Sequence, residues 1–286
     1  MTEHRDPLDV LRADVVPTEP DPAFAARLRA RLESAALNPK GATMSSSETT
    51  SVTIGETPVS EGDVVYSSLW VPDVGRAETF YTAVLGWRVE AVGDRRRVLD
   101  VSPPMGLLGG EAHGTLFLCH AVDDLDAALD RVRAAGGEAG QPQDEPYGRV
   151  ADCVDNQGMR FALLHAPRGQ RRPVPAPGAG ELFYLTVGVP NSQLYRDFYG
   201  AVFGWTFTPG RMDDGWGVTG PAPMTGMHGS ADRPAVVPMF GVADIAAAVG
   251  AVRAAGGTAA DPVRMPYGTT ADCVDDQGLP FYLGQV

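Results

Sequence analysis

The apolar positions of residues 62–167 change several times between the two-residue period of a strand and the 3.6-residue period of a helix. A strand-like stretch comes first, followed by a helical stretch that Gly86 ends, because glycine readily adopts the left-handed conformation found after helices. Short strands and a second helix follow, separated by Gly, Asp and Pro. The pattern predicts two β-α-β-β-β units, with helices at Arg76–Leu85 and Asp124–Ala135 and strands at Val64–Val71, Trp87–Val92, Arg97–Val101, Met105–Leu108, Thr115–Val122, near Glu138, Arg149–Val154 and Arg160–His165.

The same pattern then occurs a second time. PYGRVADCVDNQG begins at Pro146 and PYGTTADCVDDQG at Pro266, and the two segments share ten of thirteen residues at an offset of 120. FYTAVLGW and FYGAVFGW form a second matching pair. The sequence therefore predicts tandem copies at residues 62–167 and 181–286, joined by a Pro/Gly-rich connector at 168–180. Within PYG…QG, we expect a strand followed by a tight turn.

The residues before the first copy follow a different pattern. DPAFAARLRARLESAAL begins with an Asp suited to cap a helix, and an apolar residue recurs at every fourth position from Phe24 to Leu32. We expect a helical extension within residues 1–40 and a flexible, Ser/Thr/Glu-rich linker at 41–61. Two roles stay open for the helix: docking on the body of the protein, in cis or across a homodimer, and contact with another chain.

Composition and charge exclude several classes of partner. The net charge of −13 opposes binding to nucleic acid, which requires clustered Lys and Arg. The one basic cluster, Arg95–Arg97, is expected in a hairpin turn, as a solvated turn or a contact to an acidic ligand. No apolar run is long enough for a membrane span and no secretory signal is recognisable, so we expect no membrane partner and a cytoplasmic location. The three cysteines lack the spacing of a disulfide framework or a zinc finger.

Four such units, with FYxxVxGW after the first strand and VDDLDAAL…AAGG…DNQG…F in the second half, resemble the vicinal oxygen chelate superfamily. This group includes glyoxalase I, bleomycin-resistance proteins, fosfomycin-resistance enzymes and extradiol dioxygenases. The resemblance implies an α+β fold in which paired units form curved mixed sheets around a cleft. The chain is thus expected to hold two tandem glyoxalase/bleomycin-resistance-like domains.

The resemblance also indicates where a divalent metal would bind, on strands that face the cleft. Such a site needs nitrogen or oxygen donors and an open coordination position. The matching positions are Tyr66, Phe117, Ala162 and Leu107 or Leu108 in the first copy, and Tyr184, Val237, Tyr282 and Met227 or His228 in the second. At best one donor, His228, stands where several are needed, so we expect no metal and no cofactor.

Aromatic rings, hydroxyls and methionine occupy the expected cleft faces instead. Such side chains suit a flat, apolar, partly polar small molecule. The candidate ligand-binding residues are Tyr66, Ser68, Trp70, Phe117, Tyr147, Tyr184, Thr186, Trp216, His228, Met239, Tyr267 and Tyr282. Two alternatives stay open: the rings fill the clefts as core, and the two PYG tyrosines cap the core rather than stack on or gate a ligand.

Three functions are compatible with these residues. The leading one is metal-independent binding of a small aromatic or polyketide-like molecule, similar to sequestration by bleomycin-resistance proteins. Sequestration requires a deep apolar cleft but no catalytic group. The alternative is a metal-free isomerase, cyclase or lyase acting on a natural-product intermediate, with Asp152, Asp272, His228 or the strand tyrosines as acid or base. The third is a structural or regulatory module with plugged clefts.

Overall fold

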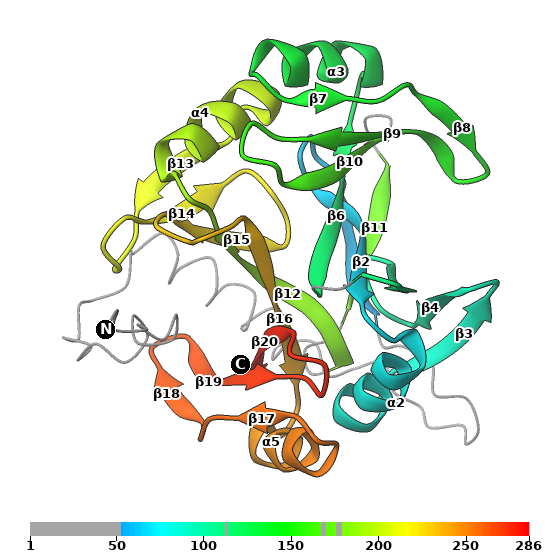
Figure 1. Ribbon diagram of the computed structural model, residues 1–286, viewed down its shortest axis with the longest axis vertical. Helices are drawn as coiled ribbons and strands as arrows, with labels where there is room; N and C mark the ends of the chain where they lie inside the picture. Colours follow the sequence, from blue (N-terminus) through cyan, green and yellow to red (C-terminus); the bar gives the residue numbers. More distant parts are fainter. Residues whose placement is uncertain (1–52, 112–113, 167–169, 176–178, 286) are drawn as a thin grey trace, which may run out of the picture. The chain divides into compact units, whose positions relative to one another are not determined.

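The computed structural model describes residues 53–111, 114–166, 170–175 and 179–285 (Figure 1). The chain divides into two compact units, residues 1–40 and 41–286, and the first lies outside the described residues. The helical extension and most of the flexible linker therefore stay predictions. None of the described helices is long and apolar enough to cross a membrane.

The first copy folds into one nine-stranded mixed sheet and two helices, α2 (Val74–Leu85) and α3 (Leu125–Ala134). The strand order is β3-β4-β5-β2-β6-β10-β9-β7, and β8 also pairs with β9. The two β-α-β-β-β units meet where β2 and β6 pair antiparallel at the middle of the sheet. The strands are β2 (Val64–Val71), β3 (Arg88–Val92), β4 (Arg95–Leu99), β5 (Met105–Gly109), β6 (Thr115–Val122), β7 (Glu138–Ala139), β8 (Gln143–Glu145), β9 (Gly148–Val154) and β10 (Arg160–His165).

The second copy repeats this arrangement with α4 (Ser192–Phe203) and α5 (Ile245–Ala254). Its strand order is β13-β14-β15-β12-β16-β20-β19-β17, and β18 pairs with β19. The predicted α+β class with tandem copies is thus confirmed. The strands are β12 (Ala179–Gly188), β13 (Thr206–Pro209), β14 (Gly215–Thr219), β15 (Met224–His228), β16 (Ala235–Val242), β17 (Thr258–Ala259), β18 (Val263–Met265), β19 (Gly268–Val274) and β20 (Pro280–Gln285).

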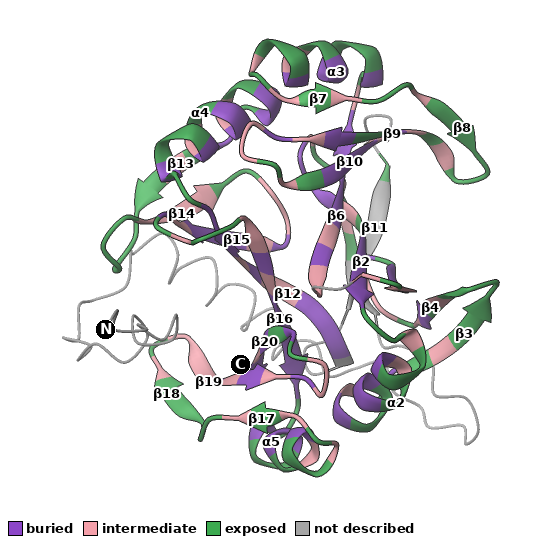
Figure 2. Cartoon of the chain, viewed as in Figure 1, coloured by how far each residue is buried: buried purple, intermediate pink, exposed green. Residues whose placement is uncertain are grey.

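Local sequence accounts for where the helices begin and end. The side chain of Asp73 accepts hydrogen bonds from two backbone N–H groups at the start of α2, and Asn191 does the same for α4. Gly86 and Gly204 end these helices with φ near +70°, a conformation that favours glycine. Each helix has one buried and one exposed side (Figure 2), so the apolar spacing decides which side packs.

Three segments differ from the sequence-based expectation. Strand β1 (Thr53–Pro58) lies in the predicted linker and pairs with β11 (Arg171–Pro175) from the Pro/Gly-rich connector. The basic cluster Arg95–Arg97 lies in strand β4 rather than in a turn, because the turn of the β3–β4 hairpin is formed by Gly93 and Asp94. Arg96 and Arg97 form ion pairs with Glu side chains of the same copy. The Ser/Thr/Glu-rich and Pro/Gly-rich compositions predicted flexible segments, and the run of arginines predicted a turn. In the structure, backbone hydrogen bonds to neighbouring strands hold all three segments as strands.

The FY motif of each copy packs against the other copy. Phe80, on α2, is buried with its ring centroid 6.0 Å from that of Phe281 in the second copy. Phe198, on α4, is likewise 6.2 Å from Phe161 in the first. A Cβ at Gly257, in the repeated AAGG, would lie 2.9 Å from the Phe80 ring, so glycine is needed for this close approach. The FY and AAGG motifs therefore form a seam between the copies, where α2 lies beside α5 and α3 beside α4.

The repeated DNQG and DDQG turns complete this seam with polar contacts. The amide of Gln277 donates to the carbonyl oxygen of Asp73 at 3.0 Å and accepts from the Asp73 N–H at 2.7 Å. Gln157 makes the same pair of bonds with Asn191, at 3.0 and 2.9 Å. The turn aspartate Asp275 is buried and accepts from the hydroxyl of Tyr81 at 3.1 Å. The conspicuous repeat is thus explained in large part by contacts that join the two copies.

The reciprocal glutamine bonds give a testable stability effect. Replacing Gln277 with alanine removes two hydrogen bonds: the Asp73 N–H loses its partner, and the Asp73 carbonyl oxygen keeps only the bond from the Ala77 N–H. Since a hydrogen bond contributes about 0.5–1.5 kcal/mol net, we expect the free energy of unfolding to fall by about 1–3 kcal/mol. Urea unfolding followed by circular dichroism measures this. Gln143→Ala, at an exposed position on β8, is the control and is expected to change the free energy of unfolding little. Equal effects from both variants would show that the hydrogen bonds between Gln277 and Asp73 contribute nothing to stability.

Candidate functional site

Register partners on neighbouring strands place two matching rows of side chains on the sheets. Partners on adjacent strands point to the same side, so each row lies on one face. We call the sides of the sheets that carry these rows the first and second tyrosine faces. The first row is Tyr66, Cys119, Ala162 and Asp152, and the second row is Tyr184, Met239, Tyr282 and Asp272.

The opposite side of each sheet packs into the hydrophobic core. Leu69, Leu118 and Leu163, which alternate with the first row along their strands, are all buried there. The period-2 pattern therefore placed Tyr66, Ser68 and Trp70 together on the first tyrosine face. Tyr184 and Thr186 share the second face in the same way.

The two strand tyrosines lie over glycines of the adjacent strand. A Cβ at Gly106 would come 2.3 Å from the hydroxyl oxygen of Tyr66, and a Cβ at Gly226 would come 2.3 Å from that of Tyr184. Both distances are far below van der Waals contact, so these positions must lack a side chain for the tyrosines to adopt this orientation. The same tyrosine–glycine pair thus orients one phenol on each face.

Each tyrosine face is flanked at its two ends by an arginine and the tyrosine of the PYG segment. The guanidinium carbon of Arg211, in the β13–β14 hairpin, lies 5.9 Å from the ring centroid of Tyr267, in the β18–β19 turn. Figure 1 shows this hairpin and this turn at the two ends of the second sheet. A contact between them means that the sheet curls over its tyrosine face. In the first copy, the charge of Arg95 acts on both Tyr66 and Tyr147.

The first tyrosine face combines two accessible phenols with a packed aromatic pair. Tyr66 is 38% exposed and Tyr147 is 69% exposed. The rings of Trp70 and Phe117 stack 4.7 Å apart at an interplanar angle of 9°, and the Arg160 guanidinium lies 4.5 Å from the Trp70 centroid. Two of the candidate residues therefore stack on each other, while the tyrosines remain open to a ligand.

The second tyrosine face is more enclosed and carries more hydroxyl groups. Burial raises the pKa of Tyr184 to about 12, and nearby Tyr267 adds to the increase. Burial also raises the pKa of Tyr282 to about 12, assisted by Asp272, Tyr184 and Tyr267. These phenols therefore stay protonated at neutral pH and act as hydrogen-bond donors. Their mutual influence shows that three tyrosines and one carboxylate converge on this face.

Two predicted residues do not join this group. Trp216 is the register partner of Met227, a core residue, and the Arg196 guanidinium of α4 lies 3.6 Å from its ring centroid. It therefore lies on the helix side of the sheet. His228 lies at the far end of β15, four residues beyond Met224, the partner of Tyr184, or about 13 Å along the strand. Its Nδ1 lies 3.0 Å from the carbonyl oxygen of Gly229.

Sequence reasoning missed two residues on the second tyrosine face. Arg211 gave no signal, because nothing in a hairpin indicates what lies across a curled sheet. Phe183 lies in a register irregularity between Leu182 and Tyr184, and its ring packs against Gly284, where a Cβ would come 2.6 Å from it. A bulge breaks the period-2 rule, so alternation could not assign Phe183 to the face.

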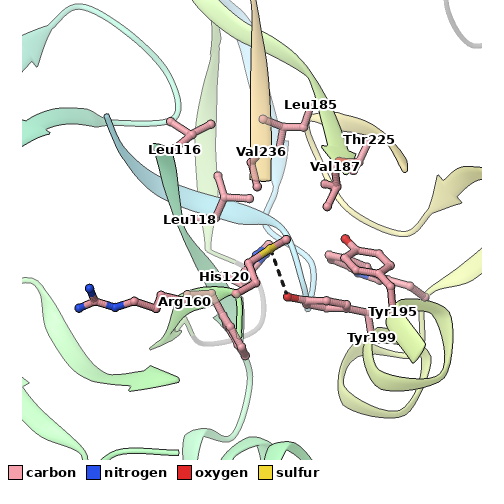
Figure 3. Close-up of a pocket in the computed structure, with 13 residues that line it drawn as sticks. Leu116, Leu118, His120, Arg160, Leu185, Val187, Tyr195, Tyr199, Thr225 and Val236 are labelled. Atoms are coloured by element: carbon pink, nitrogen blue, oxygen red, sulfur yellow. Dashed lines mark hydrogen bonds between the residues drawn. The ribbon is translucent and has the colours of Figure 1, made fainter. Parts of the chain in front are cut away.

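A separate small cavity lies between the copies, on the core side of the sheets. His120, Tyr195 and Tyr199 point into it (Figure 3), and the space is about 10 Å³, close to the least that one water needs. His120 is buried, and its Nδ1 lies 2.9 Å from the carbonyl oxygen of Gly62. Burial lowers the pKa of His120 to about 4. The cavity is too small for an organic ligand.

The comparisons with known proteins agree with this architecture. Residues 63–163 match the model of the glyoxalase/bleomycin resistance protein/dioxygenase superfamily. The chain carries a domain of this superfamily. The resemblance predicted from the sequence is thus confirmed, and the second copy repeats the element order of the matched superfamily domain.

Two proteins of Streptomyces are similar to this chain over both copies. Anthracycline biosynthesis protein DnrV of Streptomyces peucetius is 29% identical over 258 residues, covering 77% of this chain and 92% of that protein. Anthracycline biosynthesis protein DauV of Streptomyces sp. strain C5 is 28% identical with the same coverage. Among solved structures, the Mn(II)-bound glyoxalase of Novosphingobium aromaticivorans has a TM-score of 0.62 at 17% identity and covers 80% of this chain and 83% of its own. That likeness concerns the superfamily fold alone.

The metal of such glyoxalases does not fit the residues present here. The positions that the superfamily resemblance indicates carry phenol, phenyl and methyl groups in the first copy, at Tyr66, Phe117 and Ala162. Among the described residues, no three His, Cys, Asp or Glu side chains are grouped closely enough to hold a metal ion. The side chains at these positions of the first copy therefore lack the donor set that such a metal needs.

Proposed function

We propose that this protein binds a flat, partly hydroxylated aromatic molecule of the polyketide type on its tyrosine faces, without a metal, and holds it in the manner of a sequestering protein. The observation that carries this proposal is the arrangement common to both copies. A phenol seated over a glycine faces an arginine and a second tyrosine that approach from opposite ends of the sheet. The superfamily fold and the anthracycline-biosynthesis relatives support the same ligand class.

The side chains of the tyrosine faces match the chemistry of such a ligand. Aromatic rings offer large contact area with fused rings, and phenol hydroxyls donate to quinone or ketone oxygens. Arg95 and Arg211 supply positive charge for acidic phenol groups of a ligand. The net charge of −13 favours cationic ligands only by weak long-range attraction at cellular salt.

Binding of two named probes tests the proposal. We expect 1,8-dihydroxyanthraquinone and doxorubicin to bind the chelator-treated protein with unchanged affinity, as measured by ligand fluorescence. Tyr66→Ala and Tyr184→Ala each remove one phenol and are expected to weaken binding at their own face about tenfold, since aromatic pairs contribute about 0.5–1.5 kcal/mol beyond area. Leu194→Ala, on the exposed side of α4, is the control.

The outcomes separate the alternatives. Failure of both probes to bind, or binding that the tyrosine variants leave unchanged, would refute the proposed site and favour a structural role. Binding that requires added Mn²⁺ or Zn²⁺ would refute metal independence. A homodimer, with the predicted helix of residues 1–40 as its contact, stays a separate prediction that sedimentation of the full chain and of a chain beginning at residue 41 would test.

A metal-free enzyme acting on the same class of molecule is the second candidate function. One observation favours it: the carboxylate of Asp272 lies among neutral phenols on the second tyrosine face without a hydrogen-bond partner in the described part of the chain.

A further inference from the structure

The two tyrosine faces differ most where their rows meet β19 and β9. Asp152 and Asp272 occupy equivalent positions, but their register partners on the adjacent strand are Ala162 and Tyr282. The next partners inward are Cys119 and Met239. Small side chains therefore flank Asp152, which is exposed, whereas large ones flank Asp272, which is half-buried.

The surroundings of Asp272 are those of a carboxylate kept partly away from water but not neutralised by a partner. In the described part of the chain the side chain of Asp272 makes no hydrogen bond or ion pair, and burial raises its pKa. The neighbouring phenol of Tyr282, one strand away, is protonated at neutral pH. Tyr184 lies on β12, two strands from Tyr282, so the backbones of these two residues are about 10 Å apart across the sheet. The Tyr184 hydroxyl lies farther away still, over Gly226 of β15.

Asp272 and Tyr282 are register partners on adjacent strands, so a base and an acid lie side by side. Tyr184 lies farther along the same row, where it can contact the other end of a fused-ring molecule. A carboxylate without a hydrogen-bond partner is a stronger base than a solvated one, because its ionised form is less well stabilised. Neutral phenols in a site of restricted solvation stabilise an oxyanion that develops on a substrate oxygen. Arg211, above Tyr267, adds a positive charge on the same side.

We propose that the second tyrosine face catalyses proton transfer at an acidic carbon of a fused-ring aromatic ketone, with Asp272 as the general base and Tyr282 as the oxyanion donor; this inference rests on the proposed binding function. In the step, the substrate C–H bond breaks and its proton forms an O–H bond with Asp272. The electron pair forms the C=C bond of an enolate, whose oxygen accepts a hydrogen bond from the Tyr282 phenol. Return of the proton to the same or another carbon regenerates the carboxylate, so no oxidant, reductant or metal is required.

The first tyrosine face lacks this machinery. No phenol occupies the position of Tyr282, because Ala162 stands there, and the equivalent carboxylate of Asp152 is exposed. The first face is therefore a binding surface only. We therefore expect proton transfer on the second tyrosine face and binding alone on the first.

Deuterium exchange into 2-tetralone tests the inference. In D₂O at neutral pD, the protein is expected to replace the C1 hydrogens of this bicyclic ketone about 10²-fold faster than buffer, as measured by loss of their ¹H NMR signal. Asp272→Asn is expected to reduce the rate to that of buffer, and Tyr282→Phe to reduce it about tenfold. Leu194→Ala, on the exposed side of α4, is expected to exchange like the unmodified protein. Saturation-transfer difference NMR on the same samples reports binding separately.

The outcomes distinguish the two proposals. Binding of 2-tetralone without accelerated exchange would overturn the catalytic inference and leave sequestration intact. No binding of 2-tetralone or of the anthraquinone probe would overturn both. Accelerated exchange that Asp272→Asn leaves unchanged would also overturn the role of Asp272. Melting curves show whether Asp272→Asn is folded, and Tyr282→Phe, which removes one hydroxyl only, tests the same site if it is not.

Discussion

Phe80→Ala is expected to lower the free energy of unfolding by about 3–5 kcal/mol, the range typical for removing a buried phenylalanine side chain from a packed core. Phe80 is 2% exposed and its ring contacts the second copy through Phe281 and the bare backbone of Gly257. Alanine leaves a cavity between the copies. The strand that carries Phe281 and the backbone at Gly257, which line the other side, are rigid and cannot move in to fill it. Urea unfolding of the full chain measures the change.

The destabilisation caused by Phe80→Ala is expected to reach the second copy as well as the first. If the copies were independent, Phe80→Ala would weaken only the first copy. Because Phe80 belongs to a shared core, hydrogen-exchange mass spectrometry is expected to show faster exchange in β19 and β20 of the second copy as well. Phe198→Ala is the matched variant and should act on β9 and β10. Val263→Ala, at an exposed site on β18, is the control, and protection changes limited to the first copy would contradict the shared core.

The fold was largely predictable because its signals are local. The helix limits follow from Asp and Asn caps and αL glycines, and the strands follow from alternation, so most elements lie within a few residues of their predicted ranges. The role of the repeated motifs was not predictable. Two copies with the same FY and QG motifs offer each motif two chemically equal partners, one in its own copy and one in the other. Only the three-dimensional structure distinguishes them, since the contacts join residues 34 to 204 positions apart.

The candidate site shows the same division between local and non-local information. Alternation placed Tyr66 with Ser68 and Tyr184 with Thr186 on one face of their strands. It gave no warning that Trp216 lies on the opposite side, because the equivalent position in the β3–β4 hairpin of the first copy is Arg96 rather than an aromatic residue. It also gave no indication of Arg211, whose approach to Tyr267 depends on the curl of the whole sheet.

The cavity between the copies contains an asymmetry that affects acid stability. In the first copy, the indole N–H of Trp87 donates to the carbonyl oxygen of Gly180 at 2.9 Å. The equivalent carbonyl oxygen, on Gly62, is bound by His120 instead, and the indole N–H of Trp205 has no partner among the described residues. Because a carbonyl only accepts, His120 must carry its proton on Nδ1. The second copy has Phe240 in place of His120, and Trp87, whose ring packs against Phe240, is correspondingly free to bond the Gly180 carbonyl.

His120→Phe is therefore expected to remove a large part of the protein's sensitivity to mild acid. The pKa of His120 is about 4 in the folded protein, lowered by burial from 6.5. As pH falls from 6.5 to 4, the unfolded chain binds a proton that the folded protein does not, so stability is present above this window and is lost within it. The loss approaches about 1.4 kcal/mol per pH unit, or about 3 kcal/mol over the window.

The comparison between variants isolates this histidine from the other buried groups. Burial raises the pKa of Asp155 and of Asp275, so each of these carboxyls stabilises the fold as pH falls and offsets part of the histidine effect. Both contributions are the same in the two proteins, and urea unfolding at pH 7, 6, 5 and 4 gives their difference. His120→Phe should match the unmodified protein near neutral pH, because phenylalanine suits the equivalent site and frees the Gly62 carbonyl for Trp205. It should then become the more stable protein below pH 6, whereas His165→Gln, at an exposed histidine, should not. Parallel pH profiles for His120→Phe and the unmodified protein would mean that His120 is protonated in the folded state, and the burial argument would be wrong.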